Sequence, residues 1–503
     1  MPKRNLLTNP IGLSNIFAMK KTLALVFSVA LFTSLINSSA IGAVKAGATC
    51  QKAGSTVTQA GKKFTCIKSG KKFVWNKGVK VISPAPSASP TAAPAPAATT
   101  PAVATPTPTE SKPATAQAGY PAPSVPSSAV ELCKVKENNS NRNNSAFVLS
   151  AGFPGNSSLA TKTGTVKWAL IPIDFPDMKG ESNFKARVDS QMKQLSDWFN
   201  VVSEGKFKVE WVVADNWVTL PGSTSQYAIP QSVNLDKAAN GPKLFKDAMA
   251  AADPVFNFSN IQTVNFILPK GQKFIGESSQ GFPWDAAVKD LTTNEGKISS
   301  FSIPGDFFDQ LNRQYWSYWA HEFGHAMGVA HIGSSREPNP YMNLDIMGNQ
   351  DGFAKELSGW TRFVNGWLDD QKVYCQEISK LTSTELALIP LSDSTAGIKM
   401  AVVPVSATKA VVIESRRETQ FACTMPSKKN GVLVYLYDAT KSHGENFFSP
   451  VTPEGRSNES SSNCPVVPYP DSLLYKDQKI TVEGVTIEVL ESKDFDKIRL
   501  TRG

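Results

Sequence analysis

The middle of the chain carries both strand and helix patterns. Four segments show them: a continuous apolar run typical of a buried strand at residues 167–175, apolar residues at helical spacing at 183–199, a pair of strands at 207–220, and a further strand at 263–269. A Pro-Gly pair predicts a turn at 304–306, and we expect a helix from Phe308 to Val329. Because helices and strands come in mixed order, the pattern predicts an α+β domain over residues 130–372.

Beyond residue 372 the pattern changes to short segments rich in β-branched and aromatic residues. They are ELALIPL, KMAVVPV, KAVVIES, GVLVYLYD, ITVEGVTIEVL and KIRLTR. No repeat of solenoid or propeller length relates them. They predict an all-β C-terminal domain over residues 373–503.

Two segments of different character precede the α+β region. Residues 44–82 contain short alternating segments separated by turn residues, and we expect a small β module closed by a disulfide. Residues 83–129 are rich in Pro, Ala, Thr and Ser, which offer too little apolar surface to form a core. This segment is predicted to be an extended linker of partly polyproline II character.

The net charge of +9 is concentrated at the amino terminus. Residues 1–82 contain 13 Lys or Arg and no Asp or Glu, whereas the rest of the chain has 39 basic and 43 acidic side chains, a net charge of −4. This distribution argues against a nucleic-acid-binding protein. The nine lysines of the 44–82 module fit contact with an anionic polymer such as cell-wall material, and they fit a solvated surface without a partner equally well.

The first 43 residues have the features of a secretion signal. Two lysines follow Met19, the expected translation start, and an apolar run extends from Leu23 to Ile36. Small residues then lead to a cleavage site near Ala43. The apolar run is shorter than the roughly 20 residues that a membrane-spanning helix needs. We therefore expect a secreted protein, extracellular or associated with the cell envelope, with no membrane span after cleavage.

Six cysteines in an exported chain predict disulfides, because thiols oxidise outside the cytosol. Their place in one small module favours Cys50 with Cys66. The weaker predictions are Cys133 with Cys375 and Cys423 with Cys464. Cys133 is alternatively a thiolate that ligates a metal ion before activation, which would leave an odd number of cysteines.

Residues 321–331 read HEFGHAMGVAH and match the pattern H-E-x-x-H-x-x-G-x-x-H at every specified position. Residues four apart lie on one face of a helix, so His321 and His325 can face a single zinc ion. His331 supplies a third nitrogen after the chain has left the helix. Three protein ligands leave an open position for water, as in catalytic zinc sites. Glu322 lies about 100° further round the helix, where it can act as general base on that water.

Two further residues are expected to support the metal site. Gly328 permits the left-handed backbone by which a chain leaves a helix and turns back. Met347 follows the third histidine by sixteen residues, as in the methionine turn beneath the metal of metzincins. Some metzincins place an oxyanion-stabilising Tyr two residues later, where this chain has Asn349, and Tyr341 is a candidate substitute. We expect His443 to be exposed and without a role.

Beyond the motif, the chain resembles the immune inhibitor A family of bacterial secreted metallopeptidases from Lys167 to Asp438. The segments that carry the resemblance are DFPD, SEGKFKVE, WAHEFGHAMG, GFAKELSGWTRFVNGWL, VVIESRR and GVLVYLYD. The resemblance implies a metzincin-like zinc endopeptidase with a β-rich region after it, acting on a protein or peptide substrate. Members often carry Asp where this chain has His331, so we transfer neither their substrate preference nor their calcium sites; a structural Ca²⁺ cannot be derived from the sequence.

Two other functions stay open on the sequence. The first is a catalytically inactive cell-surface binding protein, which the intact HExxH disfavours because inactive homologues usually lose the Glu or a ligand. The second is a zinc amide hydrolase that acts on cell-wall material, a substrate that the basic module would suit.

Overall fold

The structure is a computed structural model. It describes residues 45–50, 55–59, 62–69, 72–77, 79–80, 119–137, 149–155, 160–229, 240–276, 279–281, 291–310, 314–333, 340–424, 430–441, 443–460 and 469–503. The chain divides into two compact units, residues 1–104 and residues 105–503. The predicted signal segment and most of the predicted linker lie outside the described residues.

The amino-terminal unit is a small antiparallel sheet. Its strands are β1 (Thr56–Gln59), β2 (Lys62–Ser69), β3 (Lys72–Trp75) and β4 (Val79–Lys80), and the other three all pair with β2. Phe64 and Cys66 on β2 are buried. Cys50 and Cys66 form a disulfide, so the predicted disulfide-closed β module is confirmed.

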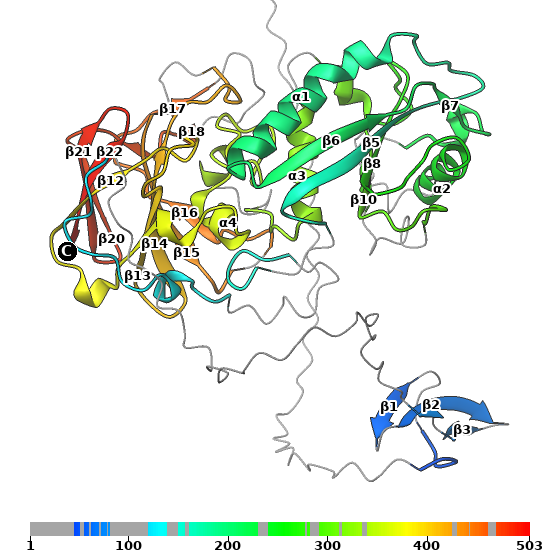
Figure 1. Cartoon of the computed structure of the whole chain (residues 1–503), viewed down its shortest axis with the longest axis horizontal. Coiled ribbons are helices and arrows are strands. Elements are labelled where there is room, and N and C mark those ends of the chain that lie inside the picture. Colours follow the sequence, from blue (N-terminus) through cyan, green and yellow to red (C-terminus); the bar gives the residue numbers. More distant parts are fainter. Residues whose placement is uncertain are drawn as a thin grey trace, which may run out of the picture. The chain divides into compact units, whose positions relative to one another are not determined.

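The larger unit is a mixture of helices and strands, as predicted. Its first part is built on a mixed six-stranded sheet of order β6-β5-β8-β10-β9, with β7 also paired to β5 (Figure 1). The strands are β5 (Gly164–Asp174), β6 (Phe207–Val213), β7 (Val218–Thr219), β8 (Ile261–Ile267), β9 (Ser279–Gly281) and β10 (Ser300–Ile303). The helices of this part are α1 (Phe184–Val202), η3 (Thr224–Gln226), α2 (Gly241–Ala252), η4 (Asp306–Asp309) and α3 (Tyr315–Ala326). All pairs in this sheet are parallel except β9 with β10.

The expected pair of strands at residues 207–220 is wrong in one respect. The segment forms β6 and β7, but within the described residues both pair with β5 and not with each other. β6 lies beside Gly164–Leu170 and β7 beside Ile173 and Asp174. Helix α1 is the crossover between β5 and β6, and such a connection produces parallel pairing. The pattern of apolar residues predicts the strands but does not determine with which strand each of them pairs.

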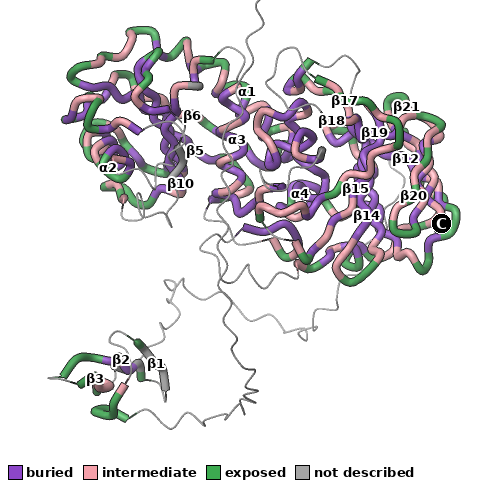
Figure 2. The backbone as a smooth tube through the Cα atoms, turned by 180° about the vertical axis from the view of Figure 1, so that it is seen from behind, coloured by how far each residue is buried: buried purple, intermediate pink, exposed green. Residues whose placement is uncertain are grey.

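Strand β5 separates two hydrophobic cores. Trp168 and Leu170 face a core that includes α1 and α3, whereas Ala169 and Ile171 face a second core that includes α2. Alternate residues of a strand point to opposite faces, so a strand covered on both faces is apolar throughout. This explains the continuous apolar run at 167–175, and Figure 2 shows the buried stretch of β5.

The C-terminal part contains two larger sheets, besides a two-stranded one formed by β17 and β18. One has the order β11-β13-β14-β15-β16 with β19 on β15, and the other has the order β12-β22-β21-β20. The strands are β11 (Val373–Cys375), β12 (Thr384–Leu388), β13 (Met400–Pro404), β14 (Lys409–Arg416), β15 (Gly431–Asp438), β16 (Phe448–Pro450), β17 (Asn458–Glu459), β18 (Tyr469–Pro470), β19 (Leu473–Leu474), β20 (Lys479–Val482), β21 (Val485–Ser492) and β22 (Asp496–Arg502). The short helices before and among them are η1 (Val130–Cys133), η5 (Pro340–Asn343), α4 (Gly359–Val364), η6 (Asp370–Lys372) and η7 (Ile378–Lys380).

Strand β14 links the two parts of the larger unit. Ala410 and Val412 belong to the core that holds α1 and α3, while Val411 and Ile413 belong to the core shared with the β12–β22 sheet. One face of the C-terminal sheet therefore covers the helical part of the unit. Val373 and Cys375, directly after the predicted boundary at residue 372, belong to the core that holds α1 and α3.

Segments before η1 are also tied to the C-terminal sheets. The Ser124 amide donates to Glu385 O over 2.8 Å, and the Ser128 amide donates to Cys375 O over 2.8 Å, so the last part of the predicted linker lies against this unit. Cys133 and Cys375 form the predicted disulfide. Cys423 is disulfide-bonded and buried, whereas its expected partner Cys464 lies outside the described residues.

A buried ion cluster joins the turn after α1 to the start of β13. The Glu204 carboxylate contacts the ammonium groups of Lys372 and Lys399, the latter at 2.7 Å, and Lys399 is 0% exposed. Burial alone would raise the pKa of Glu204, but hydrogen bonds from the two lysines outweigh it and hold the pKa below its ordinary value.

We expect Glu204→Gln to destabilise the protein by about 3–5 kcal/mol near neutral pH, because it leaves buried Lys399 without its counter-charge. A lowered folded-state pKa means that the carboxylate stabilises the fold above the unfolded value of about 4.3, and that this contribution is lost as pH falls through the folded pKa. Denaturant unfolding from pH 7 downward should therefore show a smaller acid-induced loss in the variant than in the wild type. An equal loss of unfolding free energy with falling pH in the variant and the wild type would contradict the prediction.

Among the described residues, no helix combines the length and apolar character needed to cross a membrane.

Candidate metal centre

Helix α3 carries the first half of the motif and is shorter than predicted. It runs from Tyr315 to Ala326, and Gln314 before it has an extended backbone. Its end is a Schellman motif, in which the Val329 amide donates to Gly324 O over 2.9 Å and the Gly328 amide donates to His325 O over 2.8 Å. Gly328 has φ +85°, the left-handed geometry predicted for it. The chain thus turns back directly after the second histidine.

All three motif histidines bind a backbone carbonyl through Nδ1. The acceptors are Ile346 O at 2.6 Å for His321, Val329 O at 2.9 Å for His325 and Gly333 O at 2.9 Å for His331. A carbonyl only accepts, so each Nδ1 carries the proton and each Nε2 carries the lone pair. This is the tautomer of a metal-binding imidazole whose ring is oriented by a second partner.

The three rings also face one another. Their centroids lie 4.9 Å apart for His321 and His325, 5.0 Å for His321 and His331, and 5.9 Å for His325 and His331. Imidazole nitrogens about 2.0–2.1 Å from a tetrahedral zinc would put the centroids roughly 5 Å apart. The described residues contain no ready-made cluster of three or more His, Cys, Asp or Glu side chains for a metal. The separations of the three rings are close to those of a zinc ligand set. With the protons on Nδ1, each Nε2 has the lone pair that a metal ion needs, so these three imidazoles fit zinc.

Burial keeps the three imidazoles neutral. It lowers the pKa of His321 to about 3, with a smaller effect from His331, and it lowers the pKa of His325 well below the ordinary value and that of His331 in the same direction. Only a neutral imidazole has the lone pair that a metal requires.

Glu322 lies next to His321 on α3 and is partly buried. Burial raises the pKa of its carboxyl to about 7, although a hydrogen bond from the Tyr318 hydroxyl, one helical turn earlier, acts in the opposite direction. A carboxyl with a pKa near neutrality can both accept and release a proton under physiological conditions.

Met347 lies directly beneath the helix that carries the motif. It is 1% exposed, and a Cβ built on Gly324 would lie 2.5 Å from its sulfur. Backbone groups of the same turn hold both sides of the ligand set, since Ile346 O accepts from His321 Nδ1 and Met347 O accepts from the Ile332 amide over 3.0 Å. The turn that contains Met347 therefore contacts helix α3, the His321 ring and the segment after His331.

The close packing of Met347 against Gly324 leads to a prediction. We expect Gly324→Ala to cost about 1–3 kcal/mol of stability, because the new methyl overpacks a buried contact. In a Met347→Ala background the same change should cost clearly less, since the thioether is gone. Denaturant titration of the two single variants and the double variant measures the coupling. If the losses of unfolding free energy in the two single variants simply add in the double variant, a contact other than that with Met347 is responsible for the cost of Gly324→Ala.

A buried carboxylate orders the Met347 turn. Asp345 is 1% exposed, and its two oxygens accept from the Met347 amide over 2.8 Å and from the Ser358 amide over 2.7 Å. Burial raises the pKa of this carboxyl to about 6, against the effect of the two amides. Asp345 thereby connects the turn to the start of α4.

Tyr341, the candidate oxyanion stabiliser, lies in a different place. It is 0% exposed and packs edge-on against Tyr435, with ring centroids 5.0 Å apart. Its hydroxyl interacts with Ser358, and burial raises the pKa of the phenol well above its ordinary value. This position among core aromatic residues does not favour a contact with substrate.

Another residue lies closer to the rings than the sequence suggested. His443, in the loop between β15 and β16, has its ring centroid 5.7 Å from that of His325 and 6.1 Å from that of His331. It is exposed, as expected. The chain has four histidines, and this scarcity is the signal from which the gathering of all four could have been predicted.

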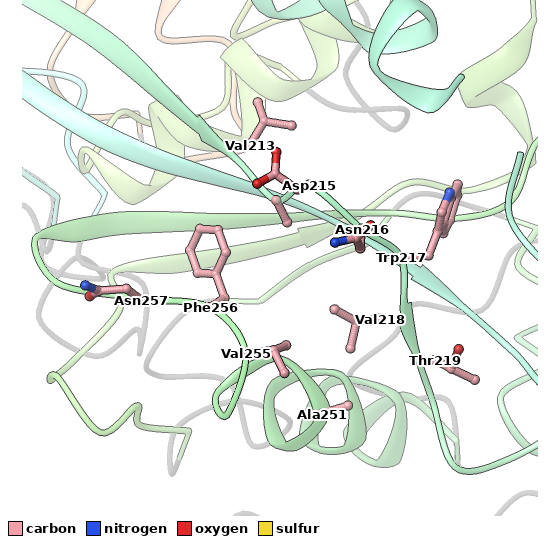
Figure 3. A pocket seen from close by; sticks show the side chains of 11 residues that line it. Val213, Asp215, Asn216, Trp217, Val218, Thr219, Ala251, Val255, Phe256 and Asn257 are labelled. Carbon is pink, nitrogen blue, oxygen red and sulfur yellow. The ribbon is translucent and has the colours of Figure 1, made fainter. Parts of the chain in front are cut away.

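A solvent-facing pocket of about 550 Å³ lies elsewhere, between the β6–β7 region and the end of α2 (Figure 3). None of its lining residues belongs to the motif. Its one titratable lining residue, Asp215, pairs with Lys185 over 2.9 Å. The pocket therefore offers neither a ligand cluster nor an acid–base pair.

Comparison with protein-family models and with curated proteins found no match for this chain.

Proposed function

We propose that the protein is a secreted zinc-dependent endopeptidase of the metzincin type, with His321, His325 and His331 as zinc ligands and Glu322 as general base. The observation that carries the proposal is the arrangement of three neighbouring neutral imidazoles, each with Nδ1 bound to a carbonyl and Nε2 left as the lone-pair atom. Three nitrogen ligands are the set that leaves one position open in catalytic zinc sites.

A bound zinc ion would supply an acidified water and a Lewis acid for the scissile carbonyl. Glu322 accepts the proton of the attacking water and returns it to the nitrogen of the leaving amine, so that the peptide bond breaks with no net proton change at the carboxylate. Tyr318 holds that carboxylate through its hydrogen bond. The turn from Asp345 to Met347 fixes His321 and the segment after His331.

The substrate class and location rest on the sequence. The resemblance to the immune inhibitor A family favours a protein or peptide substrate. The signal-like first 43 residues favour export, and the two disulfides of the described residues agree with an oxidising compartment. The basic 44–82 module is proposed to contact anionic cell-wall material.

The test is cleavage of a fluorescein-labelled, denatured casein by the purified full chain as secreted, in three states: loaded with zinc, stripped with 1,10-phenanthroline, and reloaded. We expect release of labelled peptides in the first and third states only. A second arm incubates the zinc-loaded chain with purified peptidoglycan and measures released amines. Activity on peptidoglycan alone would replace the endopeptidase with a cell-wall amide hydrolase, and activity on neither would contradict both.

A further inference from the structure

The loop from Leu344 to Gly359, which contains Met347, is held at both ends by one strand of the C-terminal sheet. At its start the Arg416 guanidinium donates through Nη1 to Leu344 O over 3.0 Å. At its end the Gly359 amide donates to Glu414 Oε2 over 2.8 Å. Glu414 and Arg416 lie two residues apart on β14, so their side chains lie on the same face of that strand. One pair of neighbouring side chains therefore holds both ends of this 344–359 loop.

The two side chains also bind each other in the interior. Arg416 Nε donates to Glu414 Oε1 over 2.6 Å, and the two residues are 5% and 0% exposed. The second carboxylate oxygen of Glu414 accepts from the Tyr435 hydroxyl over 2.9 Å as well as from the loop. Removal of one partner from such a buried ion pair leaves an uncompensated charge. The positions of the loop ends therefore depend on both members of the pair.

Backbone groups inside the 344–359 loop contact two parts of the candidate metal centre. Ile346 O accepts from His321 Nδ1 over 2.6 Å and so orients the first ligand. Met347 O accepts from the amide of Ile332 over 3.0 Å, directly after His331. A displacement of the loop would therefore turn the His321 ring and shift the segment of the third ligand.

Asp345 joins the two ends of the loop to its middle. Its carboxylate accepts from the Met347 amide over 2.8 Å and from the Ser358 amide over 2.7 Å. The positive charge of Arg416 also acts on this carboxylate. A change at Arg416 can therefore reach Ile346 O through a short series of bonded groups.

We propose that Glu414 and Arg416 are positioning residues of the metal centre, which orient the His321 imidazole by holding the 344–359 loop. They act through the backbone of that loop and are not members of the ligand set. This inference rests on the zinc site of the proposed function. It gives the C-terminal β region a part in zinc binding, because both residues belong to β14.

The first variant is Arg416→Gln, which removes the charge and cannot donate to Glu414 and to Leu344 O at once. We expect its zinc dissociation constant to rise by about 10–100-fold, the usual effect of substituting a group that orients metal ligands. Arg416→Lys keeps the charge but not the planar fork of donors, and should lose less affinity. Competition with a chromophoric chelator on the purified full chain measures both constants.

The matched control is Arg417→Gln, at the next residue of the chain. Arg417 pairs with Asp496 over 2.8 Å, and its side chain is 15% exposed against 6% for Arg416, while the carboxylate partner of each is 0% exposed. The guanidinium of Arg417 also donates to Lys493 O over 3.0 Å, so it joins β14 to the β12–β22 sheet. Both Gln variants should lose a similar amount of stability in denaturant unfolding, and only Arg416→Gln should lose zinc affinity. Equal weakening of zinc binding in the two variants would overturn the inference.

Cobalt(II) in place of zinc gives a readout that a loss of stability alone does not move. Its visible d–d bands depend on the arrangement of the ligands around the ion. We expect altered bands in cobalt-loaded Arg416→Gln and wild-type bands in Arg417→Gln. If Arg416→Gln does not fold, Arg416→Lys takes its place in both assays, with Arg417→Lys as the control. Wild-type zinc affinity and a wild-type cobalt spectrum in the Arg416 variant would overturn the inference.

The outcome is separable from that of the proposed function, because neither assay needs turnover. A wild-type chain that binds zinc but cleaves no peptide overturns the endopeptidase proposal, and the zinc affinity of Arg416→Gln still decides this inference. A wild-type chain that binds neither zinc nor cobalt overturns the metal centre, and this inference with it.

Discussion

Glu322→Gln is expected to lower kcat/KM for a peptide substrate by about 10²–10⁴-fold, the usual contribution of a general acid–base group. The amide has the shape of the carboxyl and can still accept the hydrogen bond of Tyr318, but it cannot take a proton from water. Zinc content should be unchanged, because the carboxylate lies beside the ligand set and is not part of it. Steady-state kinetics together with metal analysis of the same preparation measure both effects.

The matched control is Glu488→Gln, which removes a carboxylate that pairs with Arg499 over 2.8 Å on the β21–β22 sheet. This variant should retain wild-type kinetics and zinc content. Loss of zinc from Glu322→Gln would indicate that the carboxylate is a ligand. Full activity in Glu322→Gln would show that Glu322 is not the general base.

Asp345→Asn is expected to weaken zinc binding by about 10–100-fold, as substitutions of groups that orient metal ligands usually do. Its two carboxylate oxygens accept from two backbone amides, and Asn keeps one acceptor while its NH₂ group opposes the other amide. The buried mismatch costs about 1–3 kcal/mol and displaces the turn whose Ile346 carbonyl orients His321. Competition with a chromophoric chelator measures the zinc affinity, and denaturant unfolding measures the stability.

Asp174→Asn is the control for that effect. Asp174, at the end of β5, is 4% exposed and accepts from the Thr219 hydroxyl over 2.6 Å and from the Gly180 amide over 3.3 Å. The variant should lose stability to a similar extent and keep its zinc affinity. If both variants weaken zinc binding equally, the effect is a general consequence of destabilisation and not a property of the Met347 turn.

The local features of the candidate site could be predicted from the sequence because they depend on short-range geometry. His321 and His325 lie one helical turn apart, and Gly328 has the left-handed backbone that ends the helix there. The alternation of helix and strand patterns likewise predicted β5, α1 and β8. Both described disulfides were predicted, although the pairing of Cys133 with Cys375 spans 242 residues and rested on a weaker argument.

The features that could not be predicted depend on which distant segments meet. β6 and β7 both pair with β5 because α1 returns the chain in parallel, and an apolar pattern does not encode that choice. The place of His443 is set by the β15–β16 loop, more than a hundred residues after His331, through a bond of its ring to the His331 amide. Asp345 reads as an ordinary turn residue until its two amide partners are known.

The central claim, that three imidazoles hold one zinc ion, is tested most directly by zinc-edge X-ray absorption on the full chain after zinc loading and removal of excess metal. We expect one zinc per chain, bound by three imidazole nitrogens at about 2.0–2.1 Å and one oxygen. A chain that retains no zinc, or a zinc bound by sulfur or by four imidazoles, would contradict it.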